Sequence, residues 1–110
     1  MSGFALPSIS NYGQYSSDNY GAHTLRVDVG PLTIWFSYKT VVAFHVSGHA
    51  RVVHQNDWGP TTGKHLNWID RGDKASRVPA DQFDRLWQEQ VGPEGAFTKA
   101  LAQLAEGIGA

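Results

Sequence analysis

One stretch of the chain, Asn56–Asp70, holds most of the residues that could bind a charged ligand. After a Gly-Pro turn it continues with two threonines, a glycine and a lysine–histidine pair, which are Thr61, Thr62, Gly63, Lys64 and His65. Either threonine can cap the start of a helix. The backbone N–H groups of Gly63, Lys64 and His65 would then be available to bind phosphate or carboxylate. The stretch therefore predicts a site for a phosphate-bearing ligand, a nucleotide or a nucleotide-derived signal, in which Lys64 neutralises the charge.

Aromatic and polar side chains near this stretch would complete a nucleotide site. Trp58 and Tyr38 are predicted to stack on a base, and Asn67 and Lys39 are weaker candidates from the adjoining surfaces. The glycine spacing is not that of a Walker A loop. The alternative interpretation is structural: the threonine caps its own helix, the lysine is solvated and the tryptophan belongs to the core.

No complete catalytic set is present, because the chain has neither a Gly-x-Ser-x-Gly elbow nor a pair of glutamates spaced for glycoside hydrolysis. One enzymatic alternative is a metal-independent phosphodiesterase, in which His23 and His65 act as acid and base and Lys64 holds the phosphate. The other histidines are His45, His49 and His54. They are separated along the predicted sheet and no acidic residue lies among them, so we predict neither a metal nor a cofactor. We therefore favour a binder over an enzyme.

The composition is that of a globular protein. The chain has 110 residues, a formal net charge of -1, 41% hydrophobic residues and 17% charged residues, which predicts a single domain over 1–110. The charge argues against nucleic acid as a bulk partner, because such binding needs a basic surface. The absence of cysteine excludes disulfides and thiolate-bound zinc. Neither an apolar run of membrane-spanning length nor a signal peptide is evident, so we expect a cytoplasmic protein with no membrane partner.

The order of periodic patterns predicts an α+β fold. We expect a four-stranded antiparallel β-meander, followed by a short helix and two C-terminal helices packed on one face of the sheet. The expected segments are an N-terminal arm over 1–21, the meander over 22–56, the short helix over 61–71 and the helical part over 79–106. The nearly continuous apolar run Val41–Val46 predicts a strand that is covered on both faces.

A hairpin that turns at Gly30-Pro31 is the best-defined element, because the apolar and polar residues on each side of the turn alternate. The predicted cross-strand pairs are Val29 with Leu32, Val27 with Ile34 and Leu25 with Phe36. Arg26 then opposes Trp35 on the other face, where a cation–π contact is expected. We expect Trp35 to be exposed and, with the aromatic N-terminal arm, to support self-association into a homo-oligomer.

Three blocks of the sequence resemble a family of small bacteriophage and prophage proteins. The blocks are Ser16–Thr24 (SSDNYGAHT), Phe36–Phe44 (FSYKTVVAF) and Asn56–Asp70 (NDWGPTTGKHLNWID). The resemblance covers Asn11 to Trp87, and Gly59-Pro60 stands where a serine and a polar residue are expected. It implies a phage accessory protein in the cytoplasm of the host bacterium. Counter-defence by sequestration of the predicted ligand is then one interpretation, and a protein–protein interaction module that inhibits a host or phage protein is the alternative.

Overall fold

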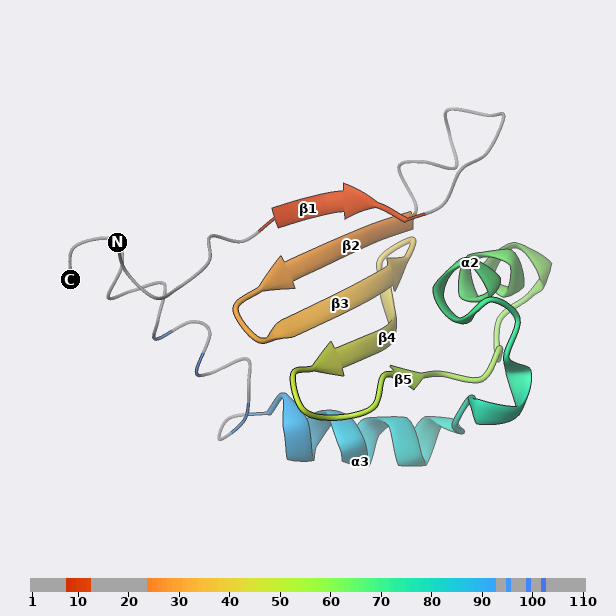
Figure 1. Cartoon of the computed structure of the whole chain (residues 1–110). Coiled ribbons are helices and arrows are strands. Elements are labelled where there is room, and N and C mark those ends of the chain that lie inside the picture. Colours follow the sequence, from red (N-terminus) through yellow and green to blue (C-terminus); the bar gives the residue numbers. More distant parts are fainter. Residues whose placement is uncertain (1–7, 13–23, 93–94, 96–98, 100–101, 103–110) are drawn as a thin grey trace.

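The structure is a computed structural model that describes residues 8–12, 24–92, 95, 99 and 102. Among these residues, five antiparallel strands form one sheet in the order of the sequence (Figure 1). The strands are β1 (Ser8–Asn11), β2 (Thr24–Val29), β3 (Leu32–Ser37), β4 (Thr40–Val46) and β5 (Val52–Val53). They are followed by α2 (Pro60–Asp70), the 3-10 helix η1 (Lys74–Ser76) and α3 (Ala80–Gln90). The predicted α+β class is confirmed.

The hairpin of β2 and β3 has the predicted register. Its partners include Val29 with Leu32, Val27 with Ile34 and Leu25 with Phe36. Gly30 has a φ of 56° at the turn, a conformation that glycine adopts without steric cost. The Arg26 guanidinium lies 5.5 Å from the centroid of the Trp35 ring, as the pairing across the hairpin predicted.

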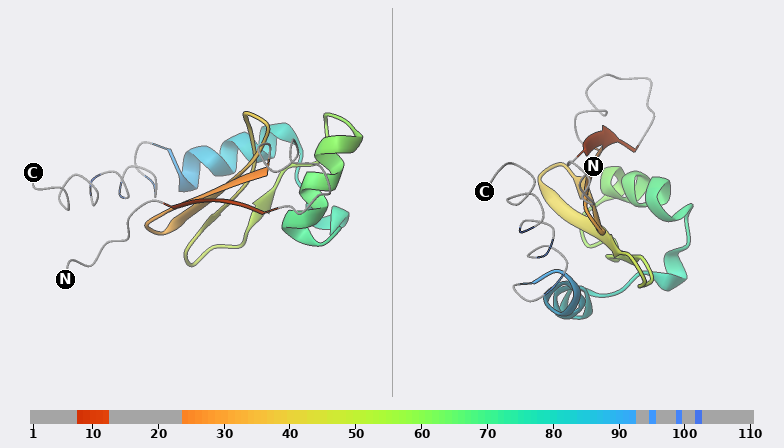
Figure 2. Two further views of the ribbon diagram at one scale, coloured as in Figure 1. Left: turned by 90° about the horizontal axis from the view of Figure 1, so that it is seen from above. Right: turned by 60° about the vertical axis from the view of Figure 1, so that its left-hand side comes forward.

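The sheet is covered on both faces, and Figure 2 shows α2 and α3 on opposite sides of it. Phe83 of α3 belongs to a buried cluster with residues of four strands and with Val91, namely Val29, Leu32, Ile34, Phe44, Val46 and Val52. Leu66 and Ile69 of α2 belong to a second cluster, with Trp35, Val42, Ala43 and Val53. The prediction that all helices lie on one face is therefore wrong. Because β4 contributes to both clusters, the prediction that this strand is covered on both faces is confirmed.

Burial beneath α2 also corrects the placement of Trp35. This side chain was predicted to be exposed, but the residue is only 7% exposed. A register shift between Trp35 and Phe36 interrupts the pairing of β3 with β4, and such bulges redirect side chains locally. The apolar stripe of α2 needs an apolar surface to cover, and Trp35 supplies part of that surface.

The first turn of α2 differs from the prediction. Gly59 occupies the N-cap position and Pro60 begins the helix, so neither Thr61 nor Thr62 is the cap. Proline suits this position because its missing N–H has no partner in the first turn and its φ is already helical. At the other end, both Arg71 and Gly72 are left-handed, with φ values of 57° and 82°. Glycine adopts this conformation at no steric cost, whereas it is uncommon for an arginine.

The N-terminal arm contributes the fifth strand, which the sequence did not predict. β1 pairs with β2, for example Ile9 with Val27. The Tyr12 hydroxyl donates to the Phe36 carbonyl at 2.7 Å, so this tyrosine fixes the arm to its own sheet. β5 is the last strand within the range of the predicted meander, and it has only two residues. The second of the two helices predicted within 79–106 falls mostly outside the described residues.

Candidate functional site

A hollow of about 400 Å³ lies where α2, the chain leaving β5 and the region of η1 meet. Its lining consists of three cations, three carboxamides, a proline and a glycine: Lys64, Lys74, Arg77, Gln55, Asn56, Asn67, Pro60 and Gly63. Within the described part of the chain, no carboxylate belongs to this lining. Its side chains therefore favour an anionic ligand.

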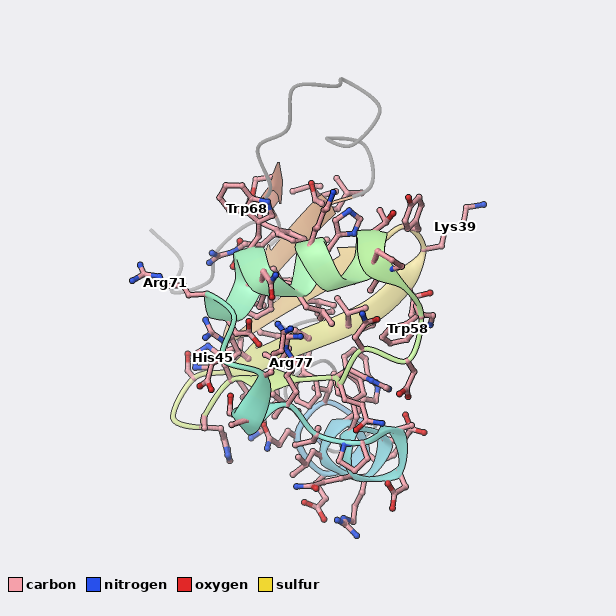
Figure 3. All side chains as sticks on the ribbon, turned by 90° about the vertical axis from the view of Figure 1, so that its right-hand side faces the viewer. Lys39, His45, Trp58, Trp68, Arg71 and Arg77 are labelled. Carbon is pink, nitrogen blue, oxygen red and sulfur yellow. The ribbon has the colours of Figure 1, made fainter. Side chains whose placement is uncertain are left out.

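Arg77 is fixed in the lining by Asp70. Its Nε donates to Asp70 Oδ2 at 2.7 Å and its Nη2 donates to Oδ1 at 2.9 Å. This is the bidentate geometry that makes arginine–carboxylate pairs strong. The two side chains are only 4% and 1% exposed, respectively. Figure 3 shows Arg77 beneath α2, on the face of the molecule that also carries Trp58.

The environment of Asp70 keeps its carboxylate ionised. Burial by itself would raise the pKa of this group. The hydrogen bonds and the charge of Arg77 oppose this effect, as do the backbone N–H of Gly72 and the charge of Arg51, and together they hold the pKa below its usual value. The carboxylate therefore remains a fixed partner for Arg77 at neutral pH.

The two lysines of the hollow differ from Arg77 because they are exposed. Neither Lys64 nor Lys74 forms an ion pair with any of the described residues. Lys64 comes from α2 and Lys74 from η1, so their charges reach the hollow from two separate elements. An anion between them would be attracted by both.

Asn67 contributes a carboxamide to the lining of the hollow. Its Oδ1 accepts from Arg77 Nη2 at 3.0 Å. Because a guanidinium only donates, this contact assigns the oxygen to the arginine side and leaves the Nδ2 donors for a ligand. Asn56 has a different role: its Oδ1 accepts from the backbone N–H groups of Trp58 and Gly59, and its Nδ2 donates to the Gly59 carbonyl. Asn56 thus shapes the chain that leads into α2.

The structure brings together three of the predicted ligand-binding residues, Gly63, Lys64 and Asn67, in the lining of this hollow. The proposed use of the backbone was wrong, however. The N–H of Gly63 donates to the Gly59 carbonyl at 2.9 Å, because the helix begins earlier than expected. Side-chain donors therefore replace the predicted backbone donors. A Cβ at Gly63 would lie 3.0 Å from Asn56 Nδ2, so the glycine also makes room for that amide.

Three further predicted residues, Tyr38, Trp58 and Thr62, line a smaller pocket of about 80 Å³. Tyr38 and Trp58 are each 45% exposed. The Trp58 ring already packs against His54, with 4.7 Å between the ring centroids. The Thr62 hydroxyl is buried and lies 3.1 Å from the Ser37 hydroxyl. The predicted site is thus divided between two depressions on either side of the first turns of α2.

Three further predicted residues, Thr61, His65 and Lys39, line neither depression. His65 is fully buried, and its Nδ1 lies 2.6 Å from the Ser37 hydroxyl. Thr61 is half-buried in α2. Lys39 projects outward at the turn between β3 and β4 (Figure 3). His23, the predicted partner of His65 in a phosphodiesterase, lies outside the described residues.

Sequence reasoning missed Gln55, Asn56, Lys74 and Arg77 as site residues. A weak sign was present, because positive charges are concentrated around α2 and the loop that follows it. The sequence could not show which of those cations turn inward. Arg71, for example, belongs to the same concentration but extends away from the molecule in Figure 3.

The chain belongs to DUF8033, a family of unknown function, whose model matches residues 8–85. The match includes every strand, α2, η1 and all eight residues of the hollow. Comparison with curated proteins and comparison with solved structures gave no match. Among the described residues, no helix is long and apolar enough to cross a membrane.

Proposed function

We propose that this protein binds a phosphate-bearing small ligand, a nucleotide or a nucleotide-derived signal, in the hollow between α2 and η1. One observation carries the proposal: three cations line the hollow and its described lining contains no carboxylate. Its volume of about 400 Å³ falls in the usual range for small-molecule sites. Charge-assisted hydrogen bonds from lysine and arginine are the interactions by which proteins commonly hold phosphate.

The aromatic side chains give the rest of such a ligand a surface to contact. Trp58 precedes α2 and is 45% exposed, on the same face as Arg77 (Figure 3). In this proposal, a base attached to the bound phosphate extends past the first turn of α2 toward this ring. Stacking on an aromatic ring tolerates any base, so the phosphate supplies most of the recognition in this proposal.

Binding without turnover is the mode that the site favours. The hollow contains cations and amides but no histidine, serine or carboxylate in its described lining. His65, the histidine of the phosphodiesterase alternative, is fully buried against Ser37. Together with the resemblance to phage proteins, these features support a role in sequestering a signal in the host cytoplasm, as a counter-defence factor.

A second candidate function is a protein–protein interaction that inhibits a host or phage protein. It is favoured by three large aromatic side chains, Tyr38, Trp58 and Trp68, each of which is 45% exposed. Exposed aromatic residues are enriched at protein interfaces. Self-association stays a prediction as well, but burial removes Trp35 from any such interface.

Isothermal titration calorimetry against a panel of nucleotides and inorganic phosphate tests the proposal. We expect saturable binding of at least one nucleotide. Lys64→Gln should weaken it roughly tenfold or more, because a charged hydrogen bond contributes about 1.5–3 kcal/mol. Arg85→Gln is the matched control, since it removes an exposed positive charge from α3. The proposal fails if the panel shows no binding, or if both variants weaken binding equally.

A further inference from the structure

We infer that the phosphate held in the hollow is a terminal monoester, which carries two negative charges, rather than a bridging or cyclic diester, which carries one. This inference rests on the proposed function and specifies its ligand class. A site of this kind would distinguish a mononucleotide with a terminal phosphate from a cyclic nucleotide with the same base and sugar.

The balance of charge in the hollow favours a dianion. Of the three cations in the lining, Arg77 is already compensated by Asp70, at 2.7 Å and 2.9 Å. Lys64 and Lys74 form no ion pair among the described residues. Two positive charges from separate elements are thus uncompensated, and a ligand with two negative charges matches them. A diester would leave one of them unmatched.

The number of donors supports the same ligand. Each lysine offers three N–H groups, and Asn67, whose Oδ1 accepts from Arg77, keeps its Nδ2 donors for other partners. Arg77 uses Nε and Nη2 for Asp70 and Asn67. No described hydrogen bond involves its Nη1. A terminal phosphate has three oxygens with which to accept from these groups, whereas a diester has two.

The inference predicts a pH dependence that belongs to the ligand. The second pKa of a phosphate monoester is about 6, so the dianion is the main form at about pH 7.5 and the minor form at about pH 5. The lining itself contributes only lysine, arginine and neutral side chains. Other titratable groups lie around this lining: Asp70 pairs with Arg77 at 2.7 Å, Asp57 accepts from Gln55, and His54 Nδ1 lies 4.0 Å from the Asp57 carboxylate. A diester measured under the same conditions reports any effect of these groups.

Calorimetry with a mononucleotide and with its cyclic counterpart tests the inference. At about pH 7.5 we expect the monoester to bind at least ~10-fold more tightly, as one additional charged contact implies. At about pH 5 its affinity should fall roughly tenfold, because about a tenth of it remains dianionic, while that of the cyclic nucleotide should not. Lys74→Gln should bring the two affinities closer together, and Arg85→Gln should not.

Three results would overturn the inference. If the cyclic nucleotide binds as tightly as the monoester, or the two ligands respond alike to pH, the hollow does not select a dianion, although the proposed function stands. If Lys74→Gln weakens both ligands by the same factor, Lys74 does not contact the second charge. If neither ligand nor inorganic phosphate binds, the proposed function fails together with the inference.

Discussion

Neutralising Asp70 should destabilise the protein far more than neutralising an exposed carboxylate. Asp70→Asn keeps the size and shape of the side chain and leaves an oxygen for the Gly72 N–H, which now donates to Oδ1 at 3.0 Å. It removes the charge that faces Arg77, whose side chain is 4% exposed and which is held at 2.7 Å. The change therefore leaves a buried guanidinium without its counter-ion.

The expected loss is about 3–5 kcal/mol of unfolding free energy, the usual cost of removing one member of a buried ion pair. Since domains of this size are stable by about 5–15 kcal/mol, this is a large fraction of the total. Urea unfolding followed by tryptophan fluorescence measures it. Asp73→Asn is the control: Asp73 is exposed and accepts from the Ser76 hydroxyl at 2.9 Å, so its loss should cost less than about 1 kcal/mol.

The effect should depend on pH in a defined direction. The pKa of Asp70 is lower in the folded protein than that of an aspartate in an unfolded chain. Its charge therefore stabilises the fold above the unfolded pKa, and this contribution is lost as the pH falls through the folded pKa. The difference in stability between the parent and Asp70→Asn should thus be constant near neutral pH and shrink below about pH 4.

Two outcomes would refute this reasoning. One is an Asp70→Asn variant that unfolds at the same urea concentration as Asp73→Asn. The other is a stability difference that grows as the solution becomes more acidic. Replacing Arg77 by Leu in the Asp70→Asn background should recover part of the loss, because the unpaired charge is then gone as well. No recovery would mean that the damage has another cause.

Three further changes test other parts of the structure. Phe44→Ala should lower the free energy of unfolding, measured in urea, by about 3–5 kcal/mol. The centroid of the buried Phe44 ring lies 5.3 Å from that of Phe83 and 5.2 Å from that of Trp87. A loss below about 1 kcal/mol would contradict this packing. Gly72→Ala should lower the free energy of unfolding by about 1–2 kcal/mol. A Cβ at this position would meet no close atom, but the φ of 82° is unfavourable for alanine. A variant more stable than the parent would show that the left-handed conformation is absent. Lys39→Ala should leave the calorimetric affinity for nucleotide unchanged, and a marked loss would move the site toward the β3–β4 turn.

Local patterns predicted the hairpin well. Alternation on both sides of Gly30-Pro31 gave the pairs of β2 and β3 that the structure shows. Such patterns depend on neighbours in the sequence, and the strand period of two leaves little freedom once the turn is placed. The apolar run of β4 likewise predicted a strand covered on both faces.

Features that depend on distant contacts were less predictable. The sequence offers both proline and threonine for the start of α2, and the structure places Pro60 in the first turn, with no side chain capping the helix. Thr62 instead contacts Ser37, from a different element. Pattern alone also did not show that α2 and α3 lie on opposite faces, since both have one apolar stripe and the sheet offers two surfaces.

The candidate site was predicted in part for the same reason. Gly63, Lys64 and Asn67 belong to one helix, so their common surface follows from the helical period. Lys74 and Arg77 reach that surface because the loop after α2 folds back, where Arg77 pairs with Asp70 and Val78 bridges to His54. A pairing over seven residues across an irregular loop has no fixed spacing from which to predict it.

Nuclear magnetic resonance can locate the proposed site most directly. A mononucleotide with a terminal phosphate is added to the ¹⁵N-labelled protein, and the amide signals that shift are mapped. We expect the largest shifts at Gly63, Lys64, Asn67 and Lys74, and Lys64→Gln should reduce these shifts markedly at a ligand concentration near the Kd of the parent protein. Shifts confined to the surface around Tyr38, or no shifts at saturating ligand, would contradict the assignment of the hollow as the binding site.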